Sequence, residues 1–297
     1  MKKNSLITHS DSFHADDIFA AATLAILLEK RGEDFEIIRT RDREVIDGGD
    51  YVFDVGGIYD ADKNRFDHHQ VGGAGKRTFG NTEVEYAAFG LVWKKFGEEI
   101  CGSKDVADRL ESKFVASIDA NDNGINLYEL KGELVPYSVQ DIFFAFRPSW
   151  KEREDYDKPF FELVDFAKKI LIREIKKTQD TILAESLVLK AYEESADKRI
   201  IVLEDHYPWV EVLQNLSEPI FVISPKADTW RVECVRKGKI SFENKKNFPS
   251  AWGGLKDEDL QKITGVEDAV FCHRALFLAV AKSKEGAMKL AQIAVES

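Results

Sequence analysis

Hydrophobic positions in the first third of the chain form short apolar runs separated by stretches with helical spacing. The apolar runs predict strands at Leu6–Thr8, Phe35–Thr40 and Tyr51–Asp54. The stretches with helical spacing predict helices at Ile18–Lys30, Glu83–Phe96 and Val106–Ile118. Alternation of strand and helix is typical of a mostly parallel sheet with helices packed on its faces. The fold class expected for this part is therefore α/β.

The second half of the chain begins with a long helical pattern and continues with another group of strands. Apolar residues keep a helical spacing from Asp157 to about Glu194, with Lys and Glu between them. Strands are expected at Ile200–Leu203, Ile220–Ile223 and Trp230–Val235, followed by a terminal helix at Gly286–Glu296. We therefore expect three segments: an N-terminal α/β domain over 1–155, a helical connector over 156–196 and a smaller α/β domain over 197–297.

Length and composition favour a cytoplasmic protein without a membrane partner. Of the 297 residues 44% are hydrophobic, but no apolar run approaches the roughly 18–20 residues of a membrane span. The N-terminal residues have too little apolar length for a signal peptide. Cys101, Cys234 and Cys272 are too scattered for a disulfide framework or a zinc-binding pair. The net charge of −11 argues weakly against nucleic acid, since it excludes a global basic field but not a local basic groove.

Candidate chemistry is concentrated in two clusters of histidine and aspartate. Four of the six histidines lie in two short segments, HSDSFHADD and DHHQ. In the first segment, one turn can bring His9, His14 and Asp16 to a common point. Asp17 is expected either to orient a ligand or to cap the following helix. Histidine and aspartate in such clusters are typical ligands of divalent metals.

Two further aspartates lie where a site of this fold class is expected. Asp54 ends an apolar strand, and Asp119 follows an apolar helix. Sites of open parallel sheets lie at the carboxyl ends of strands. One of His68 and His69 is expected to bind metal, while the other contacts a phosphate or is held by a carboxylate. We interpret Asp122 as ordinary turn chemistry, because Asn and Gly follow it.

The chemistry that fits these clusters is hydrolysis at phosphorus by a pair of cations. Two divalent ions about 3.5–4 Å apart activate a water and stabilise an in-line displacement. The aspartates favour Mn²⁺ or Mg²⁺, and the histidines shift the preference toward Mn²⁺. Fe²⁺ and Zn²⁺ remain alternatives. A metal-dependent hydrolase is therefore the first hypothesis.

The motifs resemble those of the DHH phosphoesterase superfamily and, within it, the Myg family of melanocyte-proliferating-gene proteins and their bacterial relatives. The similarity is carried by the segments FHADD, DVGG, FDHHQ and AWGGL and spans nearly the whole chain. It implies an N-terminal DHH domain with a dinuclear metal centre and a smaller C-terminal domain of the DHH-associated type. It also implies a metal-dependent hydrolase, since the eukaryotic member is described as a 3′–5′ RNA exonuclease. A homodimer is consistent with the family, but the sequence has no interface signal of its own.

The resemblance also assigns roles to individual residues. The implied metal ligands are His9, His14, Asp16, Asp54 as the bridging carboxylate, His68 and Asp119. His69 would contact the scissile phosphate, with Asp17 as a further catalytic residue. The chain departs from the superfamily in two places. It has His14 where an Asp is common, and the region Phe271–Arg274 lacks the Gly-Gly-His loop found in many DHH-associated domains.

Substrate contacts are expected from one loop of the first domain and from the second domain. The loop Gly72–Arg77 either closes over a phosphate, with Lys76 and a bidentate, catalytic Arg77, or is a plain surface loop. In the second domain the candidates are Arg231, Trp252, Gly253, Gly254, His273 and Arg274. Trp252 either stacks on a nucleobase or packs in the core.

Three functions remain open on the sequence alone. The leading hypothesis is a Mn²⁺-dependent 3′–5′ exonuclease acting on short single-stranded RNA or oligonucleotides. The second is a phosphohydrolase of a small phosphate ester such as pyrophosphate, a cyclic dinucleotide or a nucleoside phosphoadenylate. The third is a non-catalytic metal- or nucleotide-binding regulator. The complete set of expected ligands argues against this third function.

Overall fold

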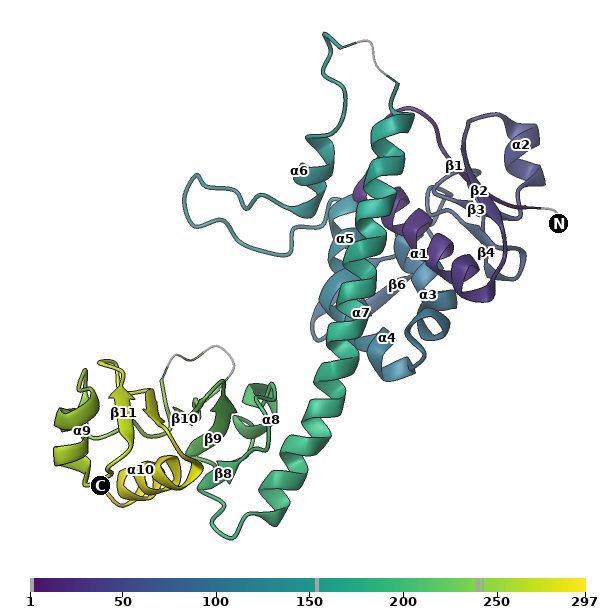
Figure 1. The fold of residues 1–297 in the computed structure, drawn as a ribbon. Helices are drawn as coiled ribbons and strands as arrows, with labels where there is room; N and C mark the ends of the chain where they lie inside the picture. Colours follow the sequence, from purple (N-terminus) through teal and green to yellow (C-terminus); the bar gives the residue numbers. More distant parts are fainter. Residues whose placement is uncertain (1–2, 153–154, 239–240, 242) are drawn as a thin grey trace. The chain divides into compact units, whose positions relative to one another are not determined.

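The computed structural model describes residues 3–152, 155–238, 241 and 243–297, and the chain divides into two compact units, Met1–Gln179 and Asp180–Ser297. Each unit combines helices with a sheet that contains parallel strands (Figure 1), which confirms the α/β class. The boundaries at residues 155 and 196 stay a prediction. Among the helices of the described ranges, none is both long and apolar enough to cross a membrane.

The first unit is built around a five-stranded sheet with the order β2-β1-β3-β5-β4. Its strands are β1 (Asn4–Thr8), β2 (Phe35–Arg39), β3 (Tyr51–Phe53), β4 (Tyr59–Asp60) and β5 (Arg65–Phe66). The helices are α1 (Ala15–Arg31), α2 (Arg43–Gly48), α3 (Ala88–Cys101), α4 (Lys104–Leu110), α5 (Ala116–Asp122), α6 (Val139–Phe144) and α7 (Asp157–Glu194). All strand pairs are parallel except β4 with β5, so the sheet is mostly parallel as predicted.

Both faces of this sheet are covered by helices, which explains the continuous apolar runs in its strands. Leu6 and Ile7 are neighbours on β1 that point to opposite faces, and both are fully buried. On one face Ile7 packs with Val52 of β3 and Ile46 of α2. Helix α1 packs against β1, β2 and α3 and ends at Gly32, whose φ of 70° suits a helix C-terminus. The helix predicted at Ile18–Lys30 is therefore confirmed.

The helix predicted at Glu83–Phe96 is wrong at both ends. Residues 76–85 form a hairpin of β6 (Lys76–Phe79) and β7 (Thr82–Glu85), and α3 begins only at Ala88. Val84 is buried between exposed glutamates, which is the alternation of a strand. Helix α3 also continues past Gly97 to Cys101, and a Cβ atom at Gly97 would lie 2.8 Å from Trp93 Nε1, so this glycine permits close packing rather than ending the helix. The signal for a strand was present, but the apolar helix pattern beside it was stronger.

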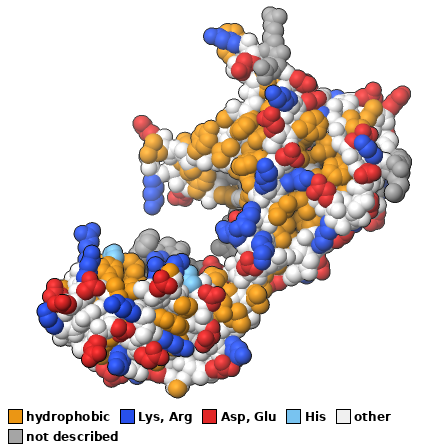
Figure 2. All heavy atoms as spheres, viewed as in Figure 1, with side chains coloured by type: hydrophobic (Ala, Val, Ile, Leu, Met, Phe, Trp, Pro, Cys, Tyr) orange, Lys and Arg blue, Asp and Glu red, His pale blue; other side chains and the backbone are white. Residues whose placement is uncertain are grey.

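The segment between α5 and α7 carries α6 and many exposed apolar side chains. Helix α6 begins at Ser138, whose hydroxyl accepts the backbone N–H of Asp141 while the Asp141 carboxylate accepts from Ser138. Figure 2 shows hydrophobic side chains gathered on this projecting part of the first unit. Leu134 and Tyr137 are 87% and 72% exposed. This segment forms one wall of the cavities described below.

Helix α7 matches its predicted bounds, Asp157–Glu194. In the first unit it buries residues at helical spacing, among them Phe160, Leu163, Ala167 and Leu171. Its start is fixed by Arg39 of β2, which lies 2.6 Å from the Asp157 carboxylate.

The second unit has a sheet of order β11-β12-β10-β9-β8, in which only β8 and β9 pair in parallel. Its elements are β8 (Ile200–Val202), α8 (Val210–Leu213), β9 (Phe221–Lys226), β10 (Thr229–Cys234), α9 (Asp257–Thr264), β11 (Ala269–Cys272), β12 (Leu278–Ala281) and α10 (Lys284–Glu296). Helix α10 packs on the sheet through small and apolar residues, including Ala287, Leu290 and Ala291. The three strands and the terminal helix predicted for this region are confirmed; α8, α9, β11 and β12 were not predicted.

Candidate metal centre

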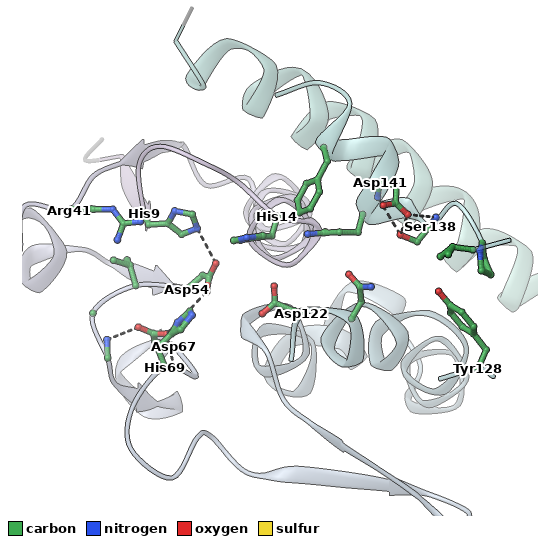
Figure 3. A pocket seen from close by; sticks show the side chains of 18 residues that line it. His9, His14, Arg41, Asp54, Asp67, His69, Asp122, Tyr128, Ser138 and Asp141 are labelled. Carbon is green, nitrogen blue, oxygen red and sulfur yellow. Dashed lines mark hydrogen bonds and ion pairs between the residues drawn. The ribbon is translucent and has the colours of Figure 1, made fainter. Parts of the chain in front are cut away.

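Three neighbouring strands of the first sheet end in histidine or aspartate. His9 follows β1, Asp54 follows β3 and Asp67 follows β5. Because β1, β3 and β5 are adjacent and parallel, their carboxyl ends meet at one edge of the sheet, beside a cavity of about 750 Å³. Figure 3 shows the His9, Asp54 and Asp67 side chains at this cavity, with Asp122 of α5 facing them.

Asp54 lies at the centre of the cluster in an uncommon backbone conformation. Its φ of 53° is in the left-handed region, where strain is often associated with function. Oδ2 lies 3.1 Å from His9 Nε2, whereas Oδ1 lies 3.4 Å from His68 Nε2 and 3.6 Å from His69 Nδ1. Burial alone would raise the pKa of Asp54, but contacts with His68 and His9 hold it below its ordinary value. An ionised carboxylate therefore lies between two groups of histidines.

The ring of His9 is oriented so that one nitrogen faces only hydrogen-bond acceptors. Nδ1 donates its proton to the backbone carbonyl of Ser10 at 3.0 Å. Nε2 then faces Asp54 Oδ2 at 3.1 Å and Asp17 Oδ2 at 3.3 Å. Burial would lower the pKa of His9, but the two carboxylates raise it to about 10. Two carboxylates around one nitrogen require a positive charge there, either a second proton or a metal ion.

His68 faces a second group of carboxylates. Its Nε2 lies 3.3 Å from Asp122 Oδ2 and 3.4 Å from Asp54 Oδ1, yet it is buried without a hydrogen bond in the described part of the chain. Asp16 belongs to the same group. Burial, followed by the charges of Asp122 and Asp54, raises the pKa of Asp16 well above its ordinary value. A cation would relieve this repulsion and give His68 a partner.

Asp16 and Asp17 connect the start of α1 to the site. Both oxygens of Asp16 accept backbone N–H bonds from the first turn of α3, at 2.7 and 2.9 Å. Asp17 Oδ1 accepts the backbone N–H of His14 at 2.8 Å, and its Oδ2 faces His9. Asp17 therefore caps α1, while its role in orienting His9 stays a prediction, because Oδ2 approaches His9 without a hydrogen bond among the described residues.

His69 is held in place by the aspartate that begins the same motif. Asp67 Oδ1 accepts hydrogen bonds from Nδ1 and the backbone N–H of His69, at 2.8 and 3.1 Å. Asp67 Oδ2 accepts the backbone N–H of Gly57 at 2.5 Å. The bond to Asp67 raises the pKa of His69 above its ordinary value. Its side chain is 62% exposed and lines the cavity, where protonation would make it a hydrogen-bond donor.

Three sets of side chains could each hold a metal ion, because the ligand atoms within a set lie within 4.8 Å of one another. Asp54 belongs to two of the sets, and so does His68. The sets are His9, His14 and Asp54; Asp54, His68 and His69; and Asp16, His68 and Asp122. Imidazole nitrogens and carboxylate oxygens are donors that suit Mn²⁺, Fe²⁺ and Zn²⁺. The buried, unbonded Nε2 of His68 and the acceptor-facing Nε2 of His9 fit a metal ion. The cluster can therefore hold metal.

Sequence comparison identifies one family over nearly the whole chain. The MYG1_exonuc family profile, described as "Uncharacterised protein family (UPF0160)", matches residues 5–295. The chain belongs to this MYG1 family. MYG1 protein C27H6.8 of Caenorhabditis elegans is 34% identical, covering 97% of this chain and 94% of its own length. MYG1 exonuclease of Bos taurus is 30% identical, covering 96% of this chain and 83% of its own length. A MYG1 protein of Chlamydia pneumoniae is 30% identical, covering 98% of this chain and 97% of its own length. The resemblance to the Myg family is confirmed.

Asp119, the predicted ligand from the last motif of this MYG1-family chain, faces away from the histidines. Its Oδ1 accepts the backbone N–H of Gly90 at 3.0 Å, and its Oδ2 lies 2.8 Å from the Arg77 guanidinium. Burial raises the pKa of Asp119 to about 7 despite Arg77. The interpretation of Asp122 as turn chemistry is wrong, because Asp122 belongs to α5 and its Oδ2 lies 3.3 Å from His68 Nε2. The geometry therefore favours Asp122 over Asp119 as a ligand.

Arg77 and Lys76 differ from the expectation as well. The Arg77 side chain is 8% exposed, packs over the Tyr86 ring and is engaged with Asp119. It therefore does not offer a bidentate contact to a phosphate in the cavity. Lys76 is exposed on the hairpin and pairs with Glu83 at 2.6 Å. The hairpin fixes both residues, since residues 76–79 form β6 rather than a loop.

Sequence reasoning missed several residues of the cavity wall. Arg41 lines the cavity on the His9 side (Figure 3) and makes a long contact, 3.5 Å, with Asp11. Its position just past the end of β2 was a usable signal. Tyr128 and Gln140 also line the cavity, but they come from the segment after α5. That segment has no periodic pattern from which its position beside the sheet could be inferred.

The candidates in the second unit are in part structural. Trp252 is 3% exposed and stacks on Phe248 in the core. Of the two alternatives for Trp252, the structure therefore supports packing in the core rather than stacking on a nucleobase. Gly253 lies against Leu276, where a Cβ atom would come within 3.1 Å. His273 accepts the backbone N–H of Ala275 through Nδ1. As substrate contacts, Arg231, Gly254, His273 and Arg274 stay predictions.

Proposed function

We propose that this chain is a phosphoesterase that uses two divalent cations, Mn²⁺ by preference, to shorten single-stranded RNA and oligonucleotides from the 3′ end. In this proposal the first unit is a DHH-type catalytic domain and the second a DHH-associated substrate domain. The observation that carries it is Asp54, whose two carboxylate oxygens face different histidines. The name "MYG1 exonuclease" of the bovine and human relatives supports the same class of reaction.

The side chains divide into ligands and groups that act on the phosphate. Asp54 would bridge the ions, with His9 and His14 on one side and Asp16, His68 and Asp122 on the other. When bound, the cations supply positive charge to the phosphate and lower the pKa of a water. His69, which Asp67 keeps in one orientation, would donate a hydrogen bond to a phosphate oxygen. Arg41 adds a second positive charge at the cavity wall.

A degradation assay tests this function directly. With Mn²⁺, a 5′-labelled oligoribonucleotide should give a ladder that shortens by one nucleotide at a time, and a 3′-labelled one should lose its label in the first step. His69→Ala should lower kcat by about 100-fold, because it removes a positioned proton donor. His206 is an exposed histidine of the second unit, so His206→Ala is the matched control and should leave kcat unchanged. Intact oligonucleotides would contradict the proposal.

Assays of the same purified protein with small phosphate compounds distinguish the exonuclease from a small-molecule phosphohydrolase. Release of phosphate from pyrophosphate or cleavage of a cyclic dinucleotide, with oligoribonucleotides left intact, would favour the second function. A protein that binds Mn²⁺ but cleaves none of these compounds would favour the regulator.

A further inference from the structure

The first unit contains a second cavity beside the one that holds the histidine cluster. Its volume is about 390 Å³, and it shares with the first cavity the wall residues Asn121, Tyr128, Ser138 and Gln140. Its remaining walls are mainly apolar and include Phe114, Ile118, Ile125, Leu127 and Val139. A volume of several hundred Å³, apolar walls and a few polar groups are typical of a small-ligand site.

Helix α5 relates this cavity to the metal cluster. Asp122, which faces His68, and Asn121, which lines both cavities, are consecutive residues near the end of α5. Ile118 lines the second cavity one turn earlier on the same helix. A ligand with a phosphate among the histidines can therefore extend an adjoining group into the second cavity.

Carboxamide groups border the apolar walls and offer unused hydrogen-bonding capacity. The Oε1 atom of Gln140 accepts the backbone N–H of Ala15 at 2.6 Å, which fixes the amide orientation. Its NH₂ group and the side-chain amides of Asn121 and Asn126 make no hydrogen bond among the residues that the structure describes. A carboxamide pairs a donor with an acceptor, which matches the edge of a nucleobase.

The aromatic wall suits a flat ring. Tyr128 is 50% exposed and belongs to both cavities, and Figure 3 shows it beyond Asp122, on the opposite side of the site from Arg41. Stacking on an exposed aromatic ring stabilises a bound base without selecting its sequence. A hydrocarbon chain would fill the apolar walls but would make no use of the three carboxamides.

We propose that this second cavity is a nucleobase subsite, which receives the base of the nucleotide whose phosphate lies at the metal centre. The subsite deepens the proposed function and rests on it for the position of the phosphate. It moves recognition of the base into the first unit, since Trp252 of the second unit is buried in its own core. Asn121 connects base and phosphate recognition, because it lines both cavities and directly precedes Asp122 on α5.

Two serines provide a matched pair of variants. Ser117 lines the second cavity from α5, whereas Ser112 does not line either cavity. Both are exposed, and each hydroxyl donates to the backbone carbonyl three residues earlier, Phe114 and Arg109 respectively. Ser117→Phe should fill the subsite with a ring, and Ser112→Phe adds the same ring elsewhere on the same helical run.

Calorimetric titration of the Mn²⁺-loaded protein tests the subsite. Adenosine 5′-monophosphate should bind about ten-fold more tightly than ribose 5-phosphate or inorganic phosphate to the wild type and to Ser112→Phe. In Ser117→Phe this advantage should disappear, while the affinity for inorganic phosphate stays the same. Equal affinities in the wild type, or an undiminished advantage in Ser117→Phe, would overturn the subsite and leave the metal-dependent hydrolase intact.

Adenosine separates the subsite from the metal centre, because it carries no phosphate. Ligand-observed NMR should detect its binding to the metal-free protein and a loss of binding in Ser117→Phe. If the protein takes up no Mn²⁺ and cleaves no phosphate ester but still binds adenosine in this way, the proposed function fails and the subsite stands. Absence of adenosine binding to the wild type would overturn the subsite.

Discussion

Asp54 combines three properties that single residues seldom share: burial, ionisation and a left-handed backbone. Its position after an apolar strand and before two glycines made it a candidate from sequence. The positive φ was not predictable, because it depends on how β3 turns beneath the histidines. The strain of such a conformation, on the order of 1–3 kcal/mol, persists only where the surroundings impose it. Here it directs the carboxylate toward His9 and His68.

Asp54→Asn should remove metal binding while preserving the fold. Asparagine keeps the shape and tolerates the left-handed region, but it lacks the negative charge between the histidines. Mn²⁺ affinity should fall by about 100-fold or more. In the wild type, Mn²⁺ at about 100 times its Kd should stabilise the protein by about 2.7 kcal/mol, seen as a higher Tm that a chelator reverses. The variant should show no such shift.

Asp11→Asn is the control for this measurement. Asp11 has a φ of 70°, so the same change is made at another left-handed aspartate, one that is exposed and outside the three sets of ligand atoms. Its Mn²⁺-dependent rise in Tm should equal that of the wild type. An unchanged rise in Asp54→Asn would contradict the position of the metal.

Asp119 and Asp122 show where residue-level prediction stops. They are three residues apart on α5 and both look inward, so spacing could not decide which one faces the histidines. The deciding partner is Arg77, which reaches Asp119 from the β6–β7 hairpin that the sequence did not reveal. Because the Asp119 oxygens face Arg77 and the Gly90 N–H, the geometry favours Asp122 as the ligand.

The two aspartates should therefore respond differently to the same substitution. Asp122→Asn should weaken Mn²⁺ binding by about 10- to 100-fold with little change in the free energy of unfolding. Asp119→Asn should cost about 1–3 kcal/mol in the metal-free protein, because it removes the 2.8 Å ion pair and leaves the buried Arg77 guanidinium with the longer 3.5 Å contact to Glu111. Urea unfolding and Mn²⁺ titration of both variants provide the measurement. The reverse pattern would restore Asp119 as the ligand.

At the scale of elements, amphipathic periodicity was reliable and short strands were not. Helices α1 and α7 were predicted because many apolar residues repeat over several turns. The two-residue strands β4 and β5 carry too little pattern to be recognised, and β7 was absorbed into the adjacent helix. Yet the DHH triplet, residues 67–69, directly follows β5, so one of the elements hardest to predict positions the most recognisable motif.

Close packing of α3 against α5 gives a prediction for one glycine. A Cβ atom at Gly90 would lie 1.8 Å from Asp119 Oδ2 and 2.6 Å from the Arg77 guanidinium. Gly90→Ala should therefore displace this buried pair and destabilise the protein by about 1–3 kcal/mol in urea unfolding. Gly48→Ala, in the last turn of α2 with open space around its Cβ, should be neutral or slightly stabilising. Equal effects of the two would contradict the packing of α3 on α5.

At the scale of the whole molecule, the α/β pattern predicted where the site lies better than what it contacts. Residues that follow parallel strands lie at the same edge of the sheet, so the position of the histidines does not depend on the conformation of the loops elsewhere. The second cavity, by contrast, needs residues 125–140 to lie beside α5, and those residues carry no periodic pattern. The expected substrate contacts of the second unit were chosen by residue type alone, which is why a core tryptophan was among them.

The three cysteines connect burial to the pH dependence of stability for the whole chain. Burial raises the pKa of Cys101 to about 12, of Cys234 to about 12 and of Cys272 to about 11. Thiols of the unfolded chain lose their protons near pH 8.5, while those of the folded chain keep them. Their contribution to stability is therefore complete below about pH 8.5 and is lost as the pH rises toward 11. Each thiol should remove about 1.4 kcal/mol of unfolding free energy per pH unit in that window.

The measurement is urea unfolding of the wild type and of the triple variant Cys101→Ala, Cys234→Ala and Cys272→Ala at pH 8, 9.5 and 10.5. Other groups titrate in this range in both proteins, so the difference between the two slopes isolates the thiols. The variant should be less stable at pH 8, because three buried side chains are shortened, but its stability should fall less steeply with pH. Native wild-type protein should also resist alkylation at pH 8, since the thiolate is the reactive form. Parallel slopes, or rapid alkylation of the native protein, would show that these thiols reach solvent.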